Sequence, residues 1–578
     1  MNNQRDKRRR GAIVLVFLAG TLVLCLGATL FGFLIRRSTP PASSTGQAAV
    51  AANEARLTIA YSPEKAALVK SLADKFNAKN LRTPDRQTMQ VLLVEKTPDQ
   101  MVSEALSGPS FQAINPDSSL WVDQLNRRYA AAQAGPATPT AGQIPSRLVG
   151  DPVRYAITPI VIAAWDDTAR KLGWPNQPVG WSTLQNLAKS DPNFKWNHSS
   201  TGTASGLLAT LAEFYAGAGV QRGLTADQAQ DKKTLDFVTG VEKTVRYYGE
   251  GELAVVQRAA KDGPKYLDAF VVSEQLVVAL NTGAFGKAPS HLVAIYPAEG
   301  TLWADHPLAL LETPDVTANQ RRTFQAFREF LAGQDVQSAI LAAGYRPADL
   351  NIPLGQSGSP LTAANGVDPK QPQTTLQLPS ADVVSAVQNV FTLTKRKTNV
   401  FLVVDTSGSM SGTKLNNVKE ALKTFIGEIP SDQESLGLVE FNTSVVNIIE
   451  LKPLAENRGP LLQSINGMRA GGNTALYDAV RTAYERLQQN NDPARINAIV
   501  VMTDGIENAS HIGLQPLVNE IKTGNQKLQV VIFTIGYGND ADMRTLQQLA
   551  DAGGGQARAG TPETIQGLYK TLSSYFGG

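Results

Sequence analysis

The chain has 578 residues, 42% of them hydrophobic and 18% charged, so it is ordinary globular material with enough length for about two to four domains. Its formal net charge is +3, but residues 5–37 carry seven basic side chains and one acidic one, which leaves −3 for the rest. A weakly acidic body has no electrostatic footprint for nucleic acid, so nucleic-acid binding is excluded from the expected functions.

A long apolar segment follows the basic N-terminus. Residues 11–35 carry no charge, and this length is enough to cross the hydrocarbon core of a membrane as a helix. Basic residues are more numerous before the segment than after it, so we expect residues 1–10 in the cytoplasm and the bulk of the chain outside, in a single-pass cell-membrane protein. The alternative is a signal peptide cleaved near residues 48–52, although its apolar region would be shorter, about 7–15 residues.

A small polar linker, residues 36–55, leads to a predicted domain at 56–354. This domain alternates apolar runs with amphipathic stretches, which predicts an α/β domain with a mainly parallel sheet, and its size favours two lobes. The expected strands are 57–62, 89–95, 155–165 and 267–281, of which the last could instead begin a helix.

After a second linker, residues 355–380, a C-terminal domain is predicted at 381–578. It begins with a helix at 381–393 and then alternates apolar strands with amphipathic helices, which predicts a Rossmann-like parallel sheet with helices on both faces. The strands are expected at 398–405, 436–441, 496–504 and 528–538, and the helices at 415–429, 475–489 and 543–553.

Polar side chains follow the strands of this C-terminal domain. Asp405, Ser407 and Ser409 lie in DTSGS after the first strand, Thr474 lies on a glycine-rich loop before a helix, and Asp504 follows the third strand. Loops at the carboxyl ends of parallel strands meet at one edge of the sheet, where ligands bind. Carboxylate and hydroxyl oxygens suit Mg²⁺ or Mn²⁺, with a coordination position left for an oxygen from outside.

This order, D-x-S-x-S followed by Thr and then Asp, resembles the metal-ion-dependent adhesion site of von Willebrand factor A domains over about residues 398–576. The resemblance implies that Ser407, Ser409 and Thr474 contact the ion. It also implies that Asp405 and Asp504 bind the ion directly or through water, and that an acidic side chain of a protein partner completes the site. The alternative is a Rossmann-like domain in which the same residues cap turns and helices.

Signatures of catalysis are missing from the sequence. None of the four histidines lies in H-E-x-x-H, there is no G-K-[ST] phosphate loop, and Ser407 is not in a G-x-S-x-G turn. We therefore expect that the chain is not an enzyme.

The domain at 56–354 resembles the type II bacterial extracellular solute-binding proteins in AYSP, INPDSSLW, the strand at 155–165, KLGWPNQPVGWSTL, NHSSTGTASG and IYPAEGTLWADHP. In that family, hydroxyls and backbone amides hold a solute between two lobes. The resemblance implies as candidate ligands Tyr61, Ser62, Ser118, Ser119, Ser199, Ser200, Thr201 and Tyr296. The hydroxyl-rich loop at 198–206 precedes a helix and suits an anion, whereas the alternative is that its residues cap the helix. His198 in this loop is expected to be a structural or loop histidine rather than a ligand.

These features predict a membrane-anchored extracytoplasmic protein that binds a protein partner through a divalent metal ion. The alternative is a solute receptor for transport or sensing, in which the A-type domain couples to a membrane partner. A third possibility is an assembly factor for a metal-inserting or chaperone ATPase, but that role needs a cytoplasmic location, against the predicted topology.

Overall fold

The computed structural model describes residues 54–134, 147–248, 251–429, 431–538, 540–561, 564, 565, 568, 569 and 572. The predicted transmembrane segment at 11–35 lies outside these residues. Within the described ranges, no helix is both long enough and apolar enough to cross a membrane.

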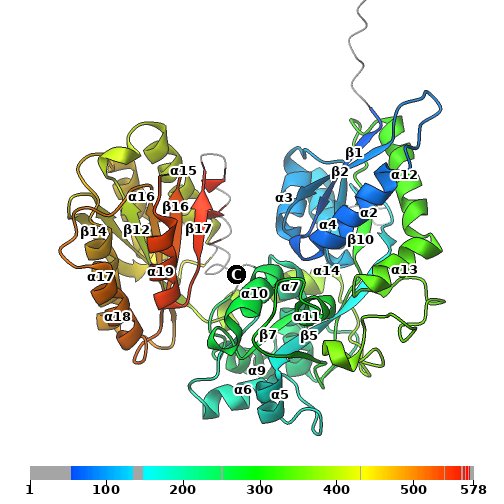
Figure 1. Cartoon of the computed structure of the whole chain (residues 1–578), viewed down its shortest axis with the longest axis horizontal. Helices are drawn as coiled ribbons and strands as arrows, with labels where there is room; N and C mark the ends of the chain where they lie inside the picture. The colour runs from blue at the N-terminus through cyan, green and yellow to red at the C-terminus, as the bar shows by residue number, and fades with distance from the viewer. Residues whose placement is uncertain are drawn as a thin grey trace, which may run out of the picture. The chain divides into compact units, whose positions relative to one another are not determined.

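The first lobe of the domain at 56–354 is built on a five-stranded sheet of order β2-β1-β3-β10-β4 (Figure 1). Strand β1 pairs in parallel with β2 and β3, whereas β10 pairs antiparallel with β3 and with β4. The strands are β1 (Arg56–Tyr61), β2 (Gln90–Glu95), β3 (Ala113–Asn115), β4 (Val153–Arg154) and β10 (Pro307–Leu310). The helices are η1 (Pro63–Lys65), α2 (Ala66–Asn77), α3 (Pro98–Ser107), α4 (Ser119–Ala134), α12 (Ala318–Leu331) and α13 (Gln334–Ala342).

The apolar face of helix α2 packs in the core of the first lobe. Leu68, Leu72 and Phe76 recur at four-residue spacing, so they lie on one face of the helix, and all three are buried in the core of the lobe. The ring of Phe76 meets the rings of Phe327 and Phe330 of α12 edge-on, with centroids 5.1 and 5.7 Å apart. Aromatic packing therefore joins the first helix of the lobe to one of its last, across about 250 residues of chain.

The second lobe has the sheet order β11-β5-β7-β6, with β8 and β9 also paired to β5. The strands are β5 (Ala156–Trp165), β6 (Trp196–Asn197), β7 (Ala269–Ser273), β8 (Leu292–Ile295), β9 (Trp303–Ala304) and β11 (Arg346–Pro347). The helices are α5 (Asp166–Leu172), α6 (Trp181–Ser190), α7 (Ala204–Ala218), α8 (Ala226–Gln230), α9 (Lys232–Glu242), α10 (Glu252–Asp262), η2 (Gly263–Lys265) and α11 (Glu274–Asn281).

The expectation of a mainly parallel sheet is wrong for this second lobe. Every partner of the long strand β5 runs antiparallel to it, and only β6 and β7 pair in parallel. The physical reason is that a fully buried apolar run has the same composition whichever way its neighbours run. The segment at 267–281 contains both the predicted strand, as β7, and the helix of the alternative, as α11.

Between the two domains, η3 (Ala363–Asn365) and α14 (Ala381–Thr394) follow the second lobe. Although α14 falls in the segment assigned by sequence to the C-terminal domain, it contacts α4, α7, α8 and α9. The exact domain boundaries stay predictions.

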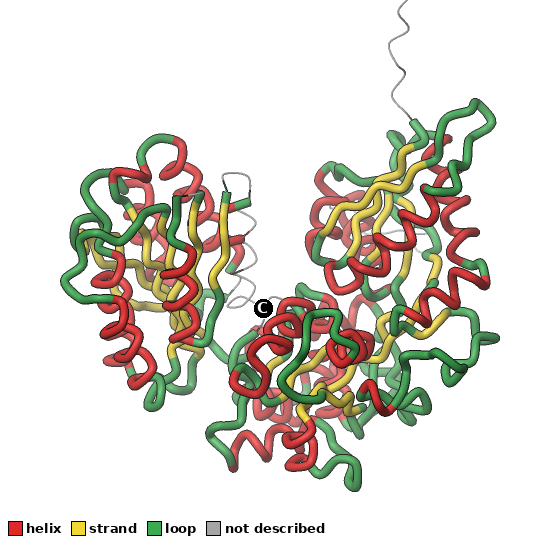
Figure 2. The backbone as a smooth tube through the Cα atoms, in the orientation of Figure 1, coloured by secondary structure: helices red, strands yellow, loops and turns green. Residues whose placement is uncertain are grey.

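The C-terminal domain has a six-stranded sheet of order β14-β13-β12-β15-β16-β17, parallel except for the edge strand β14. Figure 2 shows its strands between helices. The strands are β12 (Thr398–Asp405), β13 (Ser435–Phe441), β14 (Val445–Pro453), β15 (Ile496–Thr503), β16 (Val530–Tyr537) and β17 (Ala557–Gly560). The helices are η4 (Gly408–Met410), α15 (Thr413–Glu428), α16 (Leu454–Gly467), α17 (Leu476–Asn490), α18 (Leu514–Gly524) and α19 (Met543–Gly553).

The central strand β12 is buried along its whole length because both of its faces are covered. Val400 and Leu402 belong to a core shared with α15 and α16, whereas Phe401 and Val403 belong to a second core shared with α17 and α18. Alternate residues of a strand point to opposite faces, so a sheet covered on both sides needs a continuous apolar run. This confirms the Rossmann-like arrangement predicted for the domain.

Candidate functional site

Three loops converge at the carboxyl edge of the C-terminal sheet. Asp405 ends β12, and Asp504 directly follows the neighbouring parallel strand β15. The loop that carries Thr474 is held against the other two by backbone hydrogen bonds, one from the amide of Gly408 to the carbonyl of Gly472 (2.9 Å) and one from the amide of Asn508 to the carbonyl of Thr474 (3.1 Å). Residues that are 99 positions apart in the sequence thus share one edge because the strands before them are paired.

The side chains at this edge form a connected network of oxygens. The hydroxyl oxygens of Ser407 and Ser409 lie 3.0 Å apart, and the Ser409 hydroxyl donates to Oδ1 of Asp504 at 2.7 Å. Asp405 accepts from the backbone amide of Ser407 at 2.7 Å. It also accepts from the hydroxyl of Thr503, the last residue of β15. All of these side chains except that of Ser409 are buried.

The remaining predicted residue, Thr474, approaches the same network. A Cβ atom placed on Gly505 would lie 3.0 Å from the Thr474 hydroxyl and 3.5 Å from the Ser409 hydroxyl. Gly505 therefore lets the loop after β15 pass close to both hydroxyls. The structure thus brings the residues of the predicted metal set to one place, two carboxylates and three hydroxyls.

This donor set fits a small divalent cation. Bonds of 2.0–2.1 Å in an octahedron put neighbouring oxygen ligands about 2.9 Å apart, close to the 3.0 and 2.7 Å found along Ser407, Ser409 and Asp504. Burial raises the pKa of Asp405 to about 6, and the nearby Asp504 carboxylate adds to the rise, while hydrogen bonds from Thr503 and Ser407 lower it. A bound cation would relieve the cost of holding the Asp405 charge away from water.

Sequence reasoning missed Lys414, in the first turn of α15. Its ammonium group forms an ion pair with Oδ2 of Asp504, and this contact raises the pKa of Lys414. The only signal in the sequence is that a lysine in the first turn of a helix is slightly unfavourable beside the helix dipole, so an acidic neighbour would stabilise it. Asp504 thus has a hydroxyl on one carboxylate oxygen and an ammonium group on the other.

The predicted solute ligands fall into three groups. In the first lobe, Ser62 and Ser118 are buried, and Ser119 bonds through its backbone amide and its hydroxyl to Asp305. Tyr61 in the same lobe is half-exposed and donates to Glu95 at 3.4 Å.

In the second lobe, Ser199, Ser200 and Thr201 are buried before α7, and the hydroxyls of Ser199 and Ser200 have no hydrogen-bond partner within the described ranges. Tyr296 stands apart from both groups. Its hydroxyl donates to Glu274, and it lines a separate cavity of about 1060 Å³ beside residues 355–374.

A cluster of buried charges, which was not predicted from the sequence, lies where the two lobes meet. Lys65 of η1 donates to the carbonyl of Pro116 at 2.6 Å, and burial lowers the pKa of Lys65 to about 8. Glu252 opens α10, which contacts η1. Burial, with the added repulsion of Glu64, raises the pKa of Glu252 to about 8.

Two further members of this cluster lack partners. Both carboxylate oxygens of Asp117 and both ring nitrogens of His306 are buried without a hydrogen bond among the described residues. Burial raises the pKa of Asp117 and lowers that of His306. Buried polar atoms without partners cost free energy, which a bound ligand could recover.

The fold combines a two-lobed α/β domain with a Rossmann-like α/β domain. A family model described as bacterial extracellular solute-binding protein matches residues 57–346, half of the chain. A second model, described as von Willebrand factor type A domain, matches residues 399–568. The chain belongs to the bacterial extracellular solute-binding protein family and carries a von Willebrand factor type A domain.

Some curated relatives match less than a third of the chain, and others match most of it. Human inter-alpha-trypsin inhibitor heavy chain H4 is 31% identical over 176 residues, which is 29% of this chain and 18% of that protein. The mouse protein is 30% identical over 185 residues, 30% of this chain and 19% of its own. The chain therefore spans about a fifth of the length of these relatives. An uncharacterized protein of Mycobacterium tuberculosis is 22% identical over 597 residues, covering 95% of this chain and 81% of that one.

Two solved structures each match part of the chain. The sulfate-binding protein SubI from Mycobacterium tuberculosis covers 51% of this chain and 88% of its own, with a TM-score of 0.36 and 15% identity. A von Willebrand factor type A protein from Catenulispora acidiphila covers 31% of this chain and 43% of its own, with a TM-score of 0.27 and 21% identity.

Proposed function

We propose that the C-terminal domain captures a protein partner through a divalent metal ion held by Asp405, Ser407, Ser409, Thr474 and Asp504. The observation that carries this proposal is the meeting of two carboxylates and three hydroxyls from three loops at one edge of the sheet, a set of oxygen donors that suits Mg²⁺ or Mn²⁺. Such an ion keeps coordination positions for outside oxygens. An acidic side chain of the partner is the ligand that would bind there most strongly.

We infer the location from the sequence. The apolar segment at 11–35 would anchor the chain in the cell membrane, with residues 1–10 inside and both domains outside. A metal-dependent surface that binds proteins is useful on that side, because the partner there can belong to the cell envelope or to another cell.

The experiment is a pull-down from membranes with the purified chain as bait, in Mg²⁺ or in chelator. Capture should need Mg²⁺ and should be lost in Asp405→Ala and Ser407→Ala. The matched control is Ser411→Ala, because Ser411 is an exposed serine of the same loop whose hydroxyl only bonds to the carbonyl of Gly408. Equal capture in chelator, or equal loss in the control, would contradict the proposal.

A second candidate function is solute binding between the two lobes. It is favoured by Asp117 and His306, whose buried polar atoms have no partner in the described ranges. The cluster contains three carboxyl groups, those of Glu64, Asp117 and Glu252, but only one ammonium group, that of Lys65. This excess of acceptors favours a solute with cationic or N–H donor groups. The oxyanion expected from Ser199, Ser200 and Thr201 is the competing solute class.

A thermal-shift series separates these solute classes, because a ligand that binds only the folded state raises the melting temperature. Putrescine and sulfate are the two probes. A shift with putrescine that Asp117→Asn removes supports the charge cluster as the site. A shift with sulfate that Ser200→Ala removes supports the helix start instead, and no shift across a wider solute library would favour a scaffold without a ligand.

A further inference from the structure

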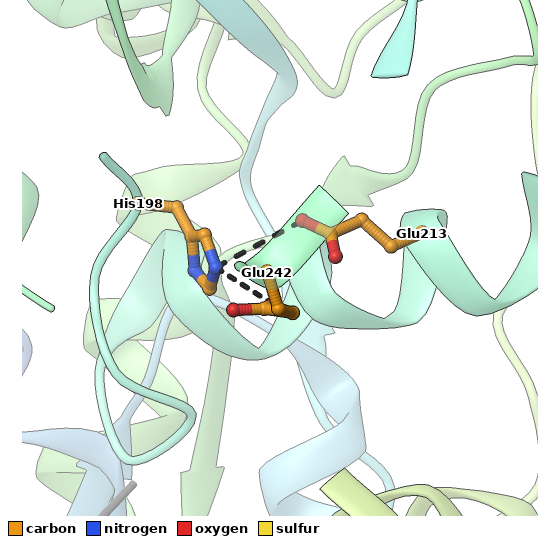
Figure 3. Close-up of side chains that lie close together, drawn as sticks. All are labelled: His198, Glu213 and Glu242. Carbon is orange, nitrogen blue, oxygen red and sulfur yellow. Dashed lines mark hydrogen bonds and ion pairs between the residues drawn. The ribbon is translucent and has the colours of Figure 1, made fainter. Parts of the chain in front are cut away.

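A second group of possible metal ligands lies inside the second lobe. Its ligand atoms are a histidine nitrogen and carboxylate oxygens, whereas the site of the C-terminal domain is built from hydroxyls and carboxylates. His198 follows β6, Glu213 lies in the middle of α7, and Glu242 ends α9 (Figure 3). All three side chains have no exposed surface. Nε2 of His198 lies 3.0 Å from Oε1 of Glu242 and 3.8 Å from Oε1 of Glu213, and one ligand atom from each residue lies within 4.8 Å of the others.

The hydrogen bonds around His198 leave its Nε2 atom facing the carboxylates as an acceptor. Nδ1 lies 2.8 Å from the carbonyl oxygen of Ser199, which can only accept, so Nδ1 carries the proton of the neutral ring. Nε2 then holds a lone pair that points at Glu242. This arrangement, a ring whose second nitrogen donates to a backbone carbonyl, is how metal-binding histidines are usually oriented.

The two carboxylates differ in their hydrogen bonds. Neither oxygen of Glu213 has a hydrogen-bond partner among the described residues. Glu242 accepts a hydrogen bond from the hydroxyl of Tyr248 at Oε2 (2.6 Å), and its Oε1 lies within hydrogen-bond distance, 3.0 Å, of Nε2 of His198. Burial and the adjacent Glu242 raise the pKa of Glu213. Three acceptor groups that face one another in a buried space need a positive species between them.

We propose that His198, Glu213 and Glu242 bind a divalent transition-metal ion, with Zn²⁺ as the ion whose chemistry fits best. Imidazole and carboxylate are both ordinary zinc ligands, with bonds of about 2.0–2.2 Å that put tetrahedral ligand atoms about 3.3 Å apart. The observed 3.0 and 3.8 Å bracket that separation. Glu213 offers two free oxygens, so it can supply the third and the fourth donor atoms. Two carboxylates and a neutral ring carry −2, which one divalent ion cancels.

The surroundings indicate a structural role for this ion. The rings of Trp196, Tyr248 and Phe391 lie around His198, with centroids 6.1, 5.4 and 6.4 Å from its own, and they keep water out. Zinc would tie α7 to α9 and fix the start of the hydroxyl-rich loop that follows His198. His198 would then be a metal ligand, contrary to the expectation from the sequence.

The competing occupant is a pair of protons, one on Nε2 of His198 and one on Glu213, which would also make the group neutral. The two cases differ in metal content. The full chain should be unfolded with chelator, refolded with or without Zn²⁺, desalted, and analysed for metals by mass spectrometry. We expect about one tightly held zinc per chain, and a higher melting temperature for the zinc-refolded chain than for the metal-free one.

Substitutions of Glu213 and Glu242 test whether these residues bind the zinc. Glu213→Gln and Glu242→Gln keep the shape of the side chain and should lower zinc content or affinity by about 10- to 100-fold or more, since each removes a ligand. Glu299→Gln is the matched control, because Glu299 is a half-buried carboxylate of the same lobe that accepts a hydrogen bond from the backbone amide of Trp181. It should keep the zinc, as should Asp405→Ala, so a failure of the adhesion-type site leaves this result unaffected.

Three results would overturn the proposal. One is a wild-type chain that holds no stoichiometric metal after refolding with Zn²⁺, Mn²⁺ or Fe²⁺, which would show that protons occupy the group. The second is zinc that survives in both Glu213→Gln and Glu242→Gln. The third is zinc that disappears in Asp405→Ala, which would place it in the other domain. Because the first measurement uses the wild-type chain, it decides the question even if the variants fold poorly.

Discussion

Lys414 supplies a sharp test of the adhesion-type metal site, because its ammonium group and a divalent cation would bind the same carboxylate. Lys414 pairs with Oδ2 of Asp504, and its side chain is 31% exposed while that of Asp504 is fully buried. Replacing Lys414 with methionine keeps a long side chain and removes the charge. The change should tighten Mg²⁺ binding, since the ion would no longer be repelled by a positive neighbour.

The magnitude follows from Coulomb's law. A divalent ion bound at Asp504 would lie about 5 Å from the ammonium nitrogen, and the repulsion at that distance is about 1.7 kcal/mol in a water-like dielectric. Salt and a swing of the half-exposed lysine away from the ion both reduce the effect. We therefore expect Lys414→Met to lower the Kd for Mg²⁺ by about 3- to 20-fold. The metal-free chain should lose about 1 kcal/mol of stability, since Asp504 loses a partner.

The assay is isothermal titration calorimetry of the purified chain with MgCl₂ at low ionic strength. The control is Lys423→Met, on the same helix and 32% exposed, where the lysine pairs with Glu420 instead. Lys423 lies nine residues further along α15, about 13.5 Å along the axis, which exceeds the Debye length in physiological salt. The control should change the Kd by less than about twofold.

An unchanged or weaker Mg²⁺ affinity in Lys414→Met would refute the reasoning, provided that Asp504→Asn abolishes binding. That pair of results would mean that the ammonium group helps to hold the site in shape rather than opposing the ion. Loss of binding in Lys423→Met as well would point to damage along α15 and not to a charge effect.

Three further predictions follow from burial, close packing and topology. The free energy of unfolding should fall between about pH 4.5 and 8 by up to about 1.4 kcal/mol per pH unit, because folded Glu252 keeps a proton that the unfolded chain releases. Urea melts at several pH values measure this slope, and Glu252→Gln should flatten it. Gly505→Ala should weaken Mg²⁺ binding about tenfold in calorimetry, by crowding Thr474 and Ser409, whereas Gly427→Ala, with open space around its Cβ, should not. Protease added to intact cells should remove both domains and spare the N-terminus, and full protection of the C-terminal domain would contradict the topology.

The sequence determined the elements of the C-terminal domain closely. The helix predicted at 415–429 is α15, the one at 543–553 is α19, and the strand at 398–405 is β12. Apolar runs of strand length and amphipathic runs of helix length are local patterns, so they survive without any knowledge of the partners. The edge strand β14 was missed because its residues are only partly buried and mix polar with apolar side chains.

The candidate metal residues were also found from the sequence, since each follows an apolar strand or opens a helix. The sequence could not predict the hydrogen-bond and ion-pair partners of these residues. The ion pair of Lys414 with Asp504 joins residues 90 positions apart, and the hydrogen bond of Thr503 to Asp405 joins residues 98 apart. Such contacts depend on which strands are neighbours, and no local pattern states that order.

The second lobe depended on tertiary structure most of all. Its apolar runs were visible, but the direction of the strands around β5 was not, because burial on both faces gives parallel and antiparallel neighbours the same composition. His198, Glu213 and Glu242 look like an isolated loop histidine and two ordinary helix carboxylates in the sequence. Only the packing of α7 and α9 around the end of β6 places the three in one buried space, where their charges must be balanced.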